Sequence, residues 1–337
     1  MSVKELIERV EEEVQDVLNT GFKFSGATSV PNYDDSGLTY ESGEIKKGKE
    51  LETCVLYADI RNSVKLNEDN DSETMGQLYT AFTKAVLRAA EKHEGSVRNI
   101  IGDRVMVVFP PTLCFKNAVD CAVSINHIAS KIINPSFTGL TFKCGIGIDY
   151  GPMKVLKVGV ERRGKENKDN KNLVWVGGPA NIASRLTDVA NKTTEEEYYE
   201  VKRYPINPRS NRNPDPITSL LRIVKPDEFG YDSTASKYCS FSETVEMSKE
   251  EFAENIYHYS DGSLYMIKGK NISFEKKKRD YTYEPILVTK DIFEGLKQED
   301  PNRNSLVKNL WKEETRDVEN VSSEILGSNL YWEFNDE

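Results

Sequence analysis

Two aspartates stand where apolar stretches of this sequence end. Asp59 closes the run LETCVLYADI, and Asp103 falls at the Gly-Asp break between two short apolar runs in SVRNIIGDRVMVVFPP. The β-branched and aromatic composition predicts strands, and the Gly-Asp break predicts a hairpin. In neighbouring strands the two carboxylates meet at one edge of a sheet, where hard oxygen ligands of this kind suit Mg²⁺ or Mn²⁺. Taken alone, either residue is more simply a strand-end or turn aspartate.

A second pair of polar residues follows the segment VGGP. Asn181 and Arg185 are four residues apart in a predicted helix with Pro179 in its first turn, so their side chains share one face. An amide and a guanidinium in this arrangement can hold a ribose oxygen and a phosphate oxygen while negative charge builds up. By themselves, the two residues would be an exposed arginine beside an amide.

Hydrophobic periodicity predicts the elements that position these four residues. The expected elements are, in chain order, a helix over about 3–19, a mostly irregular lead-in, a strand over 51–60, a helix over about 72–92 capped by Ser72, the hairpin SVRNIIGDRVMVVFPP, a helix over about 114–132, a second hairpin around Tyr150-Gly151-Pro152, the charged loop ERRGKENKDNKN, the short strand LVWV and the helix that begins at Gly177-Gly178-Pro179. Strand, helix, hairpin, helix and strand make a βαββαβ plan, an α+β fold with helices packed on one face of a sheet.

The remaining sequence changes character twice. Segment 192–282 is rich in tyrosine, charge and proline and has poor periodicity, so we expect an insertion or cap within a single domain. Regular pattern returns in PILVTKDIFEGLK, a strand and a helix capped by Thr289, and in LYWEF, a last strand. The predicted organisation is a helix and lead-in over 1–50, a core over 51–191, the insertion over 192–282 and a closing part over 283–337.

The overall composition excludes several kinds of function. A formal net charge of −10 argues against a general affinity for nucleic acid or anionic membranes, and no stretch resembles a signal peptide or a membrane span. The five cysteines are scattered and odd in number, which predicts reduced thiols in a cytoplasmic protein. With three histidines, none near another in the sequence, a histidine-based triad or metal site is not expected.

The segments YADIRNS, IIGDRVMVVF and VGGPANIASRL, in this order and at these separations, resemble the catalytic domain of class III nucleotidyl cyclases. The resemblance covers about 51–190 well and 283–337 weakly, and it does not reach 192–282. It implies the ferredoxin-like βαββαβ catalytic fold of that family, with a long C-terminal insertion or extension.

The resemblance also implies a role for each polar residue. Asp59 and Asp103 would bind two Mg²⁺ or Mn²⁺ ions per site, with the backbone carbonyl of Ile60 assisting. Asn181 would orient the ribose, and Arg185 would stabilise the pentavalent phosphorus. The implied reaction is in-line attack of the ribose 3′-oxygen on the α-phosphorus, with release of pyrophosphate.

Family members work as antiparallel dimers, in which one protomer supplies the metal-binding aspartates and the other supplies the Asn/Arg helix. This chain retains both halves, so the resemblance implies a homodimer with two equivalent sites.

The positions that read the base depart from those of purine cyclases. Adenylate cyclases carry a lysine three residues before the hairpin glycine and an aspartate seven before the helix asparagine, and guanylate cyclases typically carry a glutamate and a cysteine. This chain has Asn99 and Val174 there. The amide of Asn99 can pair with uracil or cytosine, and a smaller base leaves room for Tyr57 to pack. If the loop before Val174 is shifted, Asn172 takes the base-reading role instead.

These features, with the ADIRNS variant and the VPNYDD lead-in, resemble the bacterial pyrimidine cyclases of Pycsar antiphage systems. Members of that group make cyclic UMP or cyclic CMP, which activates a separate effector without a stable complex. The resemblance favours UTP over CTP as substrate, because uridylate cyclases are the commoner type. It names neither the activating signal nor the role of 192–282.

The expected phosphate contacts depart from the family as well. Class III cyclases usually carry a lysine in a turn before the last strand, and SSEILGSNLYWEF has none. Lys268 and Lys270 resemble that turn but precede PILVTKDIF, so we expect them in a surface turn. Ser63 can offer its hydroxyl or backbone N–H to the β- or γ-phosphate. Arg61 and Arg104 can pair either with the metal-binding aspartates or with phosphate.

Three other functions are compatible with parts of this pattern. The first is an adenylate or guanylate cyclase with an atypical base pocket. The second is a degenerate cyclase-like domain that binds a nucleotide and signals by interaction, against which the four intact polar residues argue. The third is a palm-type polymerase or diguanylate cyclase, which needs a GGDEF-like or DxD-like hairpin, whereas IIGDRV has one acidic residue at its tip.

Overall fold

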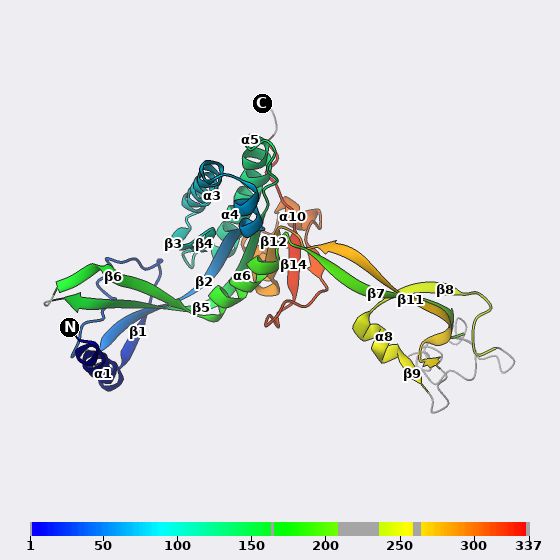
Figure 1. The fold of residues 1–337 in the computed structure, drawn as a ribbon, viewed down its shortest axis with the longest axis horizontal. Helices are drawn as coiled ribbons and strands as arrows, with labels where there is room; N and C mark the ends of the chain where they lie inside the picture. The colour runs from blue at the N-terminus through cyan, green and yellow to red at the C-terminus, as the bar shows by residue number, and fades with distance from the viewer. Residues whose placement is uncertain (1, 163–164, 208–235, 259–263, 335–337) are drawn as a thin grey trace. The chain divides into compact units, whose positions relative to one another are not determined.

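The computed structural model describes residues 2–162, 165–207, 236–258 and 264–334 (Figure 1). Close contacts divide the chain into two units, one made of Met1–Lys192 and Tyr283–Glu337 and the other of Thr193–Thr282. This cut lies beside the boundaries of the segment that composition sets apart. None of the helices within these described ranges is long and apolar enough to cross a membrane.

The first unit contains a nine-stranded sheet within its described residues. Its strands are β1 Phe22–Gly26, β2 Lys46–Ile60, β3 Ser96–Ile101, β4 Arg104–Val108, β5 Cys144–Arg162, β6 Lys165–Val176, β12 Ile286–Thr289, β13 Lys312–Glu314 and β14 Ile325–Ser328. Its helices are α1 Val3–Thr20, α2 Ser63–Asp69, α3 Ser72–Lys92, α4 Cys114–Ile128 with a π-helical turn over Ala129–Ile133, α5 Asn134–Ser136, α6 Gly178–Val189, α9 Lys290–Glu299 and α10 Asn304–Val307.

The centre of this sheet has the ferredoxin-like arrangement. The chain follows β2, α3, β3, β4, α4 and β5, and the strands lie in the order β5-β2-β4-β3, with every neighbouring pair antiparallel. Ala58 pairs with Val105, so the next residues, Asp59 and Arg104, face each other across β2 and β4. Asp103 lies one residue further, in the β3–β4 turn. The register therefore brings both aspartates to one edge of the sheet.

Strand β2 is buried on both faces from Thr53 onward. Leu56 and Ala58 belong to a large core that also contains apolar side chains of α3, α4 and α9. Val55 and Tyr57 point to the other face and pack in a smaller cluster with Ala183 of α6. The prediction that helices cover one face only was wrong, because α6 has its own small-residue stripe and packs on the face opposite α3 and α4.

The second predicted hairpin was also wrong. Strand β5 runs straight through Gly151, which pairs with Thr53 of β2. The turn-like Gly-Pro pair is accommodated because β2 begins at Lys46, before the expected strand, and offers β5 a partner as far as Val155. The hairpin is instead formed by β5 and β6, so the charged segment expected as a loop lies largely in strands. Residues 163–164 lie outside the described residues.

Four local predictions need smaller corrections. The lead-in contains β1, which pairs in parallel with β2. Helix α3 is capped by Asp71, whose side chain accepts from two backbone N–H groups, and Ser72 is its first residue. Thr289 occupies the N-cap position of α9, but its hydroxyl donates to Asp149 instead. The segment LYWEF is not a strand: Leu330 packs on the core as irregular chain, and β14 is the last strand among the described residues.

The second unit contains a five-stranded sheet in the order β8-β7-β11-β10-β9. Its elements are β7 Thr193–Pro205, β8 Glu243–Ser248, α8 Lys249–Asn255, β9 Ile256–His258, β10 Leu264–Met266 and β11 Gly269–Thr282. Acidic β7 and basic β11 are joined by ion pairs such as Lys278–Glu195, and the alternation of charges hides the strand pattern in the sequence. Lys268 and Lys270 are exposed, in the β10–β11 turn and at the start of β11.

Candidate active site

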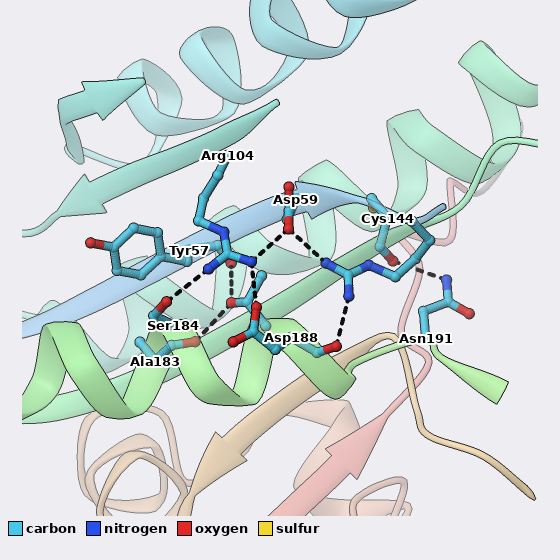
Figure 2. Close-up of polar contacts among 10 residues, drawn as sticks. Tyr57, Asp59, Arg104, Cys144, Ala183, Ser184, Asp188 and Asn191 are labelled. Carbon is cyan, nitrogen blue, oxygen red and sulfur yellow. Dashed lines mark hydrogen bonds and ion pairs between the residues drawn. The ribbon is translucent and has the colours of Figure 1, made fainter. Parts of the chain in front are cut away.

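Asp59 lies near the end of β2 and is almost buried, with 9% of its surface exposed. Its Oδ2 accepts a hydrogen bond from Arg61 Nη2 at 3.0 Å and another from Arg104 Nη2 at 2.7 Å (Figure 2). Both sequence-predicted arginines therefore pair with this aspartate rather than standing free.

Asp103 is held by the tight β3–β4 turn, in which Gly102 adopts a φ of +61° that glycine accepts without strain. Its Oδ2 is buried and has no hydrogen-bond partner. Burial and the neighbouring charge of Asp59 raise the pKa of Asp103, and the hydroxyl of Ser63 lowers it in part. Asp59, Asp103 and Ser63 thus form one electrostatic cluster.

This cluster fits a divalent cation. Hard carboxylate oxygens are the ligands of Mg²⁺ and Mn²⁺, and a buried carboxylate oxygen without a partner is costly unless a cation or proton satisfies it. The described residues contain no group of three or more His, Cys, Asp or Glu side chains that could hold a metal ion. Further ligands would therefore come from backbone, water and substrate oxygens. Ile60, whose carbonyl is the expected backbone ligand, pairs with Cys144 in the sheet.

Helix α6 is tied to the aspartate cluster through Arg104. Arg104 Nη1 donates to Ser184 Oγ at 2.8 Å, and Nη2 donates to Asp188 Oδ1 at 2.5 Å (Figure 2). Sequence reasoning missed Ser184 and Asp188. Their four-residue spacing on the helix that carries Asn181 and Arg185 was a signal that could have found them.

Asn181 and Arg185 lie on the same helix but do not meet the aspartates. Asn181 is exposed, and half-buried Arg185 donates from Nη1 to the backbone oxygen of Glu319 at 3.4 Å. Among the residues that the structure describes, neither side chain has a hydrogen bond or ion pair with Asp59 or Asp103. One chain thus carries both halves of the expected site without joining them.

Two glycines of β5 allow α6 to pack this closely. A Cβ on Gly147 would come within 2.3 Å of the Ala183 carbonyl oxygen, and one on Gly145 within 2.4 Å of the Ala190 oxygen. Helix and strand backbones are therefore in direct contact, and Thr187 Oγ1 adds a bond to the backbone oxygen of Tyr57 at 3.2 Å.

The candidate base-reading residues fall into two groups. Tyr57 and Asn99 both pair with Met106 across β2, β4 and β3, so the three side chains form one row on the α6 face of the sheet. Val174 is 38% exposed on β6, and its neighbours Leu173 and Trp175 are the residues that pack in the cluster with Tyr57. Since strand side chains alternate, Val174 points away from that row.

The alternative base reader, Asn172, already has partners. Its Oδ1 accepts from the hydroxyl of Tyr33 at 2.6 Å and from Leu173 N at 2.8 Å. Tyr33 belongs to the VPNYDD lead-in, a segment whose only predicted significance was its resemblance to the bacterial pyrimidine cyclases.

No family model matches this chain. A curated relative, the uridylate cyclase of Burkholderia cepacia, is 30% identical over 172 residues, which cover 50% of this chain and 70% of that protein. The chain belongs to the class III nucleotidyl cyclases, close to the uridylate cyclases. It is a nucleotidyl cyclase with the catalytic fold of that family.

Two further proteins are also similar to this cyclase. The uridylate cyclase of Rhodovulum sp. is 22% identical over 212 residues, covering 60% of this chain and 81% of that protein. Among solved structures, the adenylyl cyclase CyaB from P. aeruginosa is 15% identical with a TM-score of 0.43, covering 84% of this chain and 95% of that one.

Proposed function

We propose that this cyclase converts UTP into 3′,5′-cyclic UMP and pyrophosphate at a site made by two copies of the chain. The observation that carries the proposal is the separation of the two half-sites. Asp59 and Asp103 form a cluster at one edge of the sheet. Asn181 and Arg185 lie on α6, and among the described residues their side chains have no hydrogen bond or ion pair with either aspartate. A two-fold dimer can join the aspartates of one protomer to the Asn/Arg helix of its partner, twice.

In this mechanism the chain positions a triphosphate and compensates its charge. Asp59 and Asp103 would hold two Mg²⁺ or Mn²⁺ ions, with the Ile60 carbonyl and the neighbouring Ser63 close to the phosphates. When bound, such ions lower the pKa of the attacking 3′-hydroxyl and neutralise the leaving pyrophosphate.

The other half-site acts on the reacting phosphorus. Exposed Asn181 would orient the ribose so that the 3′-oxygen lies in line with the α-phosphorus. Arg185, whose contact with the backbone of Glu319 is long at 3.4 Å, is free to turn its guanidinium to the charge that develops there. CTP is the second candidate substrate, since an amide can pair with either pyrimidine.

The selection of a pyrimidine rests on the row Tyr57, Met106 and Asn99. Asn99 is exposed and offers both an amide donor and an amide acceptor, which match the edge of uracil. Tyr57 packs against the apolar cluster that contains Met106 and would leave less room for a larger purine. Val174, which points away from this row, would not read the base directly.

We also propose that cyclic UMP acts as a second messenger for a separate antiphage effector. The resemblance to pyrimidine cyclases of defence systems supports this role. A diffusible product requires no stable complex between the two proteins.

The decisive experiment offers the purified chain ATP, GTP, CTP and UTP separately with Mn²⁺, and identifies the products by mass spectrometry. We expect cyclic UMP as the main product. Product made chiefly from ATP or GTP would overturn the pyrimidine assignment while leaving the cyclase chemistry intact.

A further inference from the structure

Arg104 shares one guanidinium nitrogen between two carboxylates. Its Nη2 lies 2.7 Å from Asp59 Oδ2 and 2.5 Å from Asp188 Oδ1, while Nη1 lies 2.8 Å from Ser184 Oγ (Figure 2). The Arg104 side chain is 27% exposed and that of Asp59 is 12% exposed, so this pairing is only partly screened by solvent. Arg104 therefore links a proposed metal ligand to the last turns of α6.

Asp59 has a second cationic neighbour. Arg61 Nη2 donates to the same Oδ2, and Arg61 Nη1 donates to the backbone oxygen of Asp188 at 3.0 Å. Two guanidinium groups thus converge on one carboxylate oxygen. A divalent cation that binds Asp59 must compete with both of them for its negative charge.

The two arginines differ in the hydrogen-bond partners that remain to them when Asp59 binds a cation. Besides Asp59, the side chain of Arg61 has only the neutral peptide oxygen of Asp188 as a partner among its described hydrogen bonds. Arg104 still donates hydrogen bonds to the charged carboxylate of Asp188 and to the hydroxyl of Ser184. Asp188 therefore lowers the cost of taking Arg104 away from Asp59, because the displaced guanidinium stays paired.

We propose that Arg104 exchanges between Asp59 and Asp188, and so couples divalent-cation binding at Asp59 to the position of α6. Arg104 is a positioning residue in this scheme. The inference rests on the proposed function, since it takes Asp59 as a cation ligand. In a homodimer, α6 carries Asn181 and Arg185 for the partner's site.

The test is a double-mutant cycle on Mn²⁺ affinity. The full chain is titrated with Mn²⁺ alone, without nucleotide, and free Mn²⁺ is followed by its EPR signal. Arg104→Gln removes the competitor and should tighten Mn²⁺ binding roughly fivefold, whereas Asp188→Asn should weaken it roughly threefold. In the Arg104→Gln background, Asp188→Asn should have no further effect, because no guanidinium needs the second carboxylate.

Matched controls come from an exposed ion pair on α3. Arg88 and Glu91 have 80% and 69% exposed side chains. Arg88→Gln and Glu91→Gln change the net charge by the same amounts as the two test substitutions, and they should leave Mn²⁺ affinity unchanged. Equal effects from the control pair would reduce the result to general electrostatics and overturn the proposal.

The remaining outcomes separate the two levels of inference. Additive effects of Arg104→Gln and Asp188→Asn, or weaker Mn²⁺ binding by Arg104→Gln, would overturn the exchange but not the metal site. Mn²⁺ binding that survives both Asp59→Asn and Asp103→Asn would overturn the metal site itself. If Arg104→Gln does not fold, Arg104→Lys serves instead: an ammonium lacks the guanidinium fork, so the Asp188→Asn effect should shrink below threefold.

Discussion

At the scale of single residues, the two aspartates of the site differ in their surroundings. Asp59 is neutralised by two arginines, whereas Asp103 has a buried oxygen without a partner and a raised pKa that originates in burial and in the charge of Asp59. In the absence of a cation, the charge on Asp103 therefore costs stability, which supports the proposal that Asp103 is a cation ligand.

Replacing Asp103 by Asn should abolish cyclase turnover without unfolding the chain. The amide keeps the size of the carboxylate but carries no charge to bind a divalent cation. Because the buried carboxylate is unfavourable in its charged form, its removal should leave the melting temperature equal or higher. Product formation and thermal melting measure the two effects. Asp69→Asn, an exposed change on α2, is the control and should keep full activity. Undiminished turnover by Asp103→Asn would refute the assignment of this residue.

A second residue-scale prediction concerns Asp149. This carboxylate is 4% exposed, and burial raises its pKa to about 6 despite the hydrogen bond from Thr289. Because the folded-state pKa lies above the unfolded value, the folded state binds the proton more tightly. Its stabilising contribution is present below about pH 4 and is lost as the pH rises through about 6.

Asp149→Asn should therefore stabilise the protein at pH 7.5, by up to roughly 3 kcal/mol for a shift of about two pKa units. The advantage should shrink towards pH 4. Urea unfolding at several pH values measures it. An Asn variant that is less stable than the wild type at pH 7.5, or that keeps the same pH profile, would contradict the prediction.

At the scale of elements, α6 occupies a position that only glycine permits on β5. The carbonyl oxygen of Ala183 lies 2.3 Å from where a Cβ of residue 147 would be, and both are backbone-bound positions of a helix and a strand. Packing of this kind holds Ser184 and Asp188 against Arg104, so the helix position and the aspartate cluster depend on each other.

Gly147→Ala should push α6 away from the sheet. We expect a loss of roughly 1–3 kcal/mol in the free energy of unfolding, the usual cost of overpacking, together with reduced turnover. Gly178→Ala at the start of α6 is the matched control, because its Cβ would meet nothing within 4 Å. Denaturant unfolding and cyclase assays compare the two. Normal stability and activity in Gly147→Ala would show that α6 is not held by this contact.

At the scale of the whole molecule, each chain carries the two groups of residues proposed as half-sites, and complementation tests whether they belong to one site. Asp59→Ala and Arg185→Ala should each be inactive alone. Co-refolded in equal amounts, half of the dimers should be mixed and carry one intact site each, which restores about a quarter of wild-type activity. Mixing Asp59→Ala with Asp103→Ala is the control and should restore nothing, because both changes fall in the same half-site. Absence of rescue in the first mixture would argue against a shared site.

The second unit offers another test at this scale. Tyr283 N donates to Lys192 O at 3.1 Å, and Thr193 pairs with Thr282, so the chain leaves and re-enters the first unit through neighbouring residues. Replacing 193–282 by an Asn-Gly turn should preserve the fold and the unstimulated turnover of the first unit. Circular dichroism and product assays check this. An unfolded product would show that the unit is structural, and loss of a regulated response alone would assign it a regulatory role.

Much of the core was predictable from local pattern. The helices near 3–20, 72–92 and 114–128 follow from apolar spacing, and the β3–β4 hairpin follows from its Gly-Asp break. The predictions for 72–92 and 114–128 depend on the alternation of buried and exposed positions, which neighbouring residues carry, whereas helix 3–20 has no buried residue. The prediction of a Gly151-Pro152 turn failed because a long partner strand overrode the local turn preference. The prediction of a strand at LYWEF failed because no strand of the described residues pairs with it.

The sequence by itself predicted the chemistry: Asp59, Asp103, Asn181 and Arg185, at their spacings, supply the carboxylate, amide and guanidinium groups proposed for the cyclase site. Tertiary structure decided which of these residues come into contact, which the spacing of residues in the sequence does not specify. Pairing of β2 with β4 brought the aspartates to one edge, and close packing of α6 on β5 placed Asp188 against Arg104. These contacts join residues far apart in the chain, so they depend on sheet register and backbone approach rather than on local pattern.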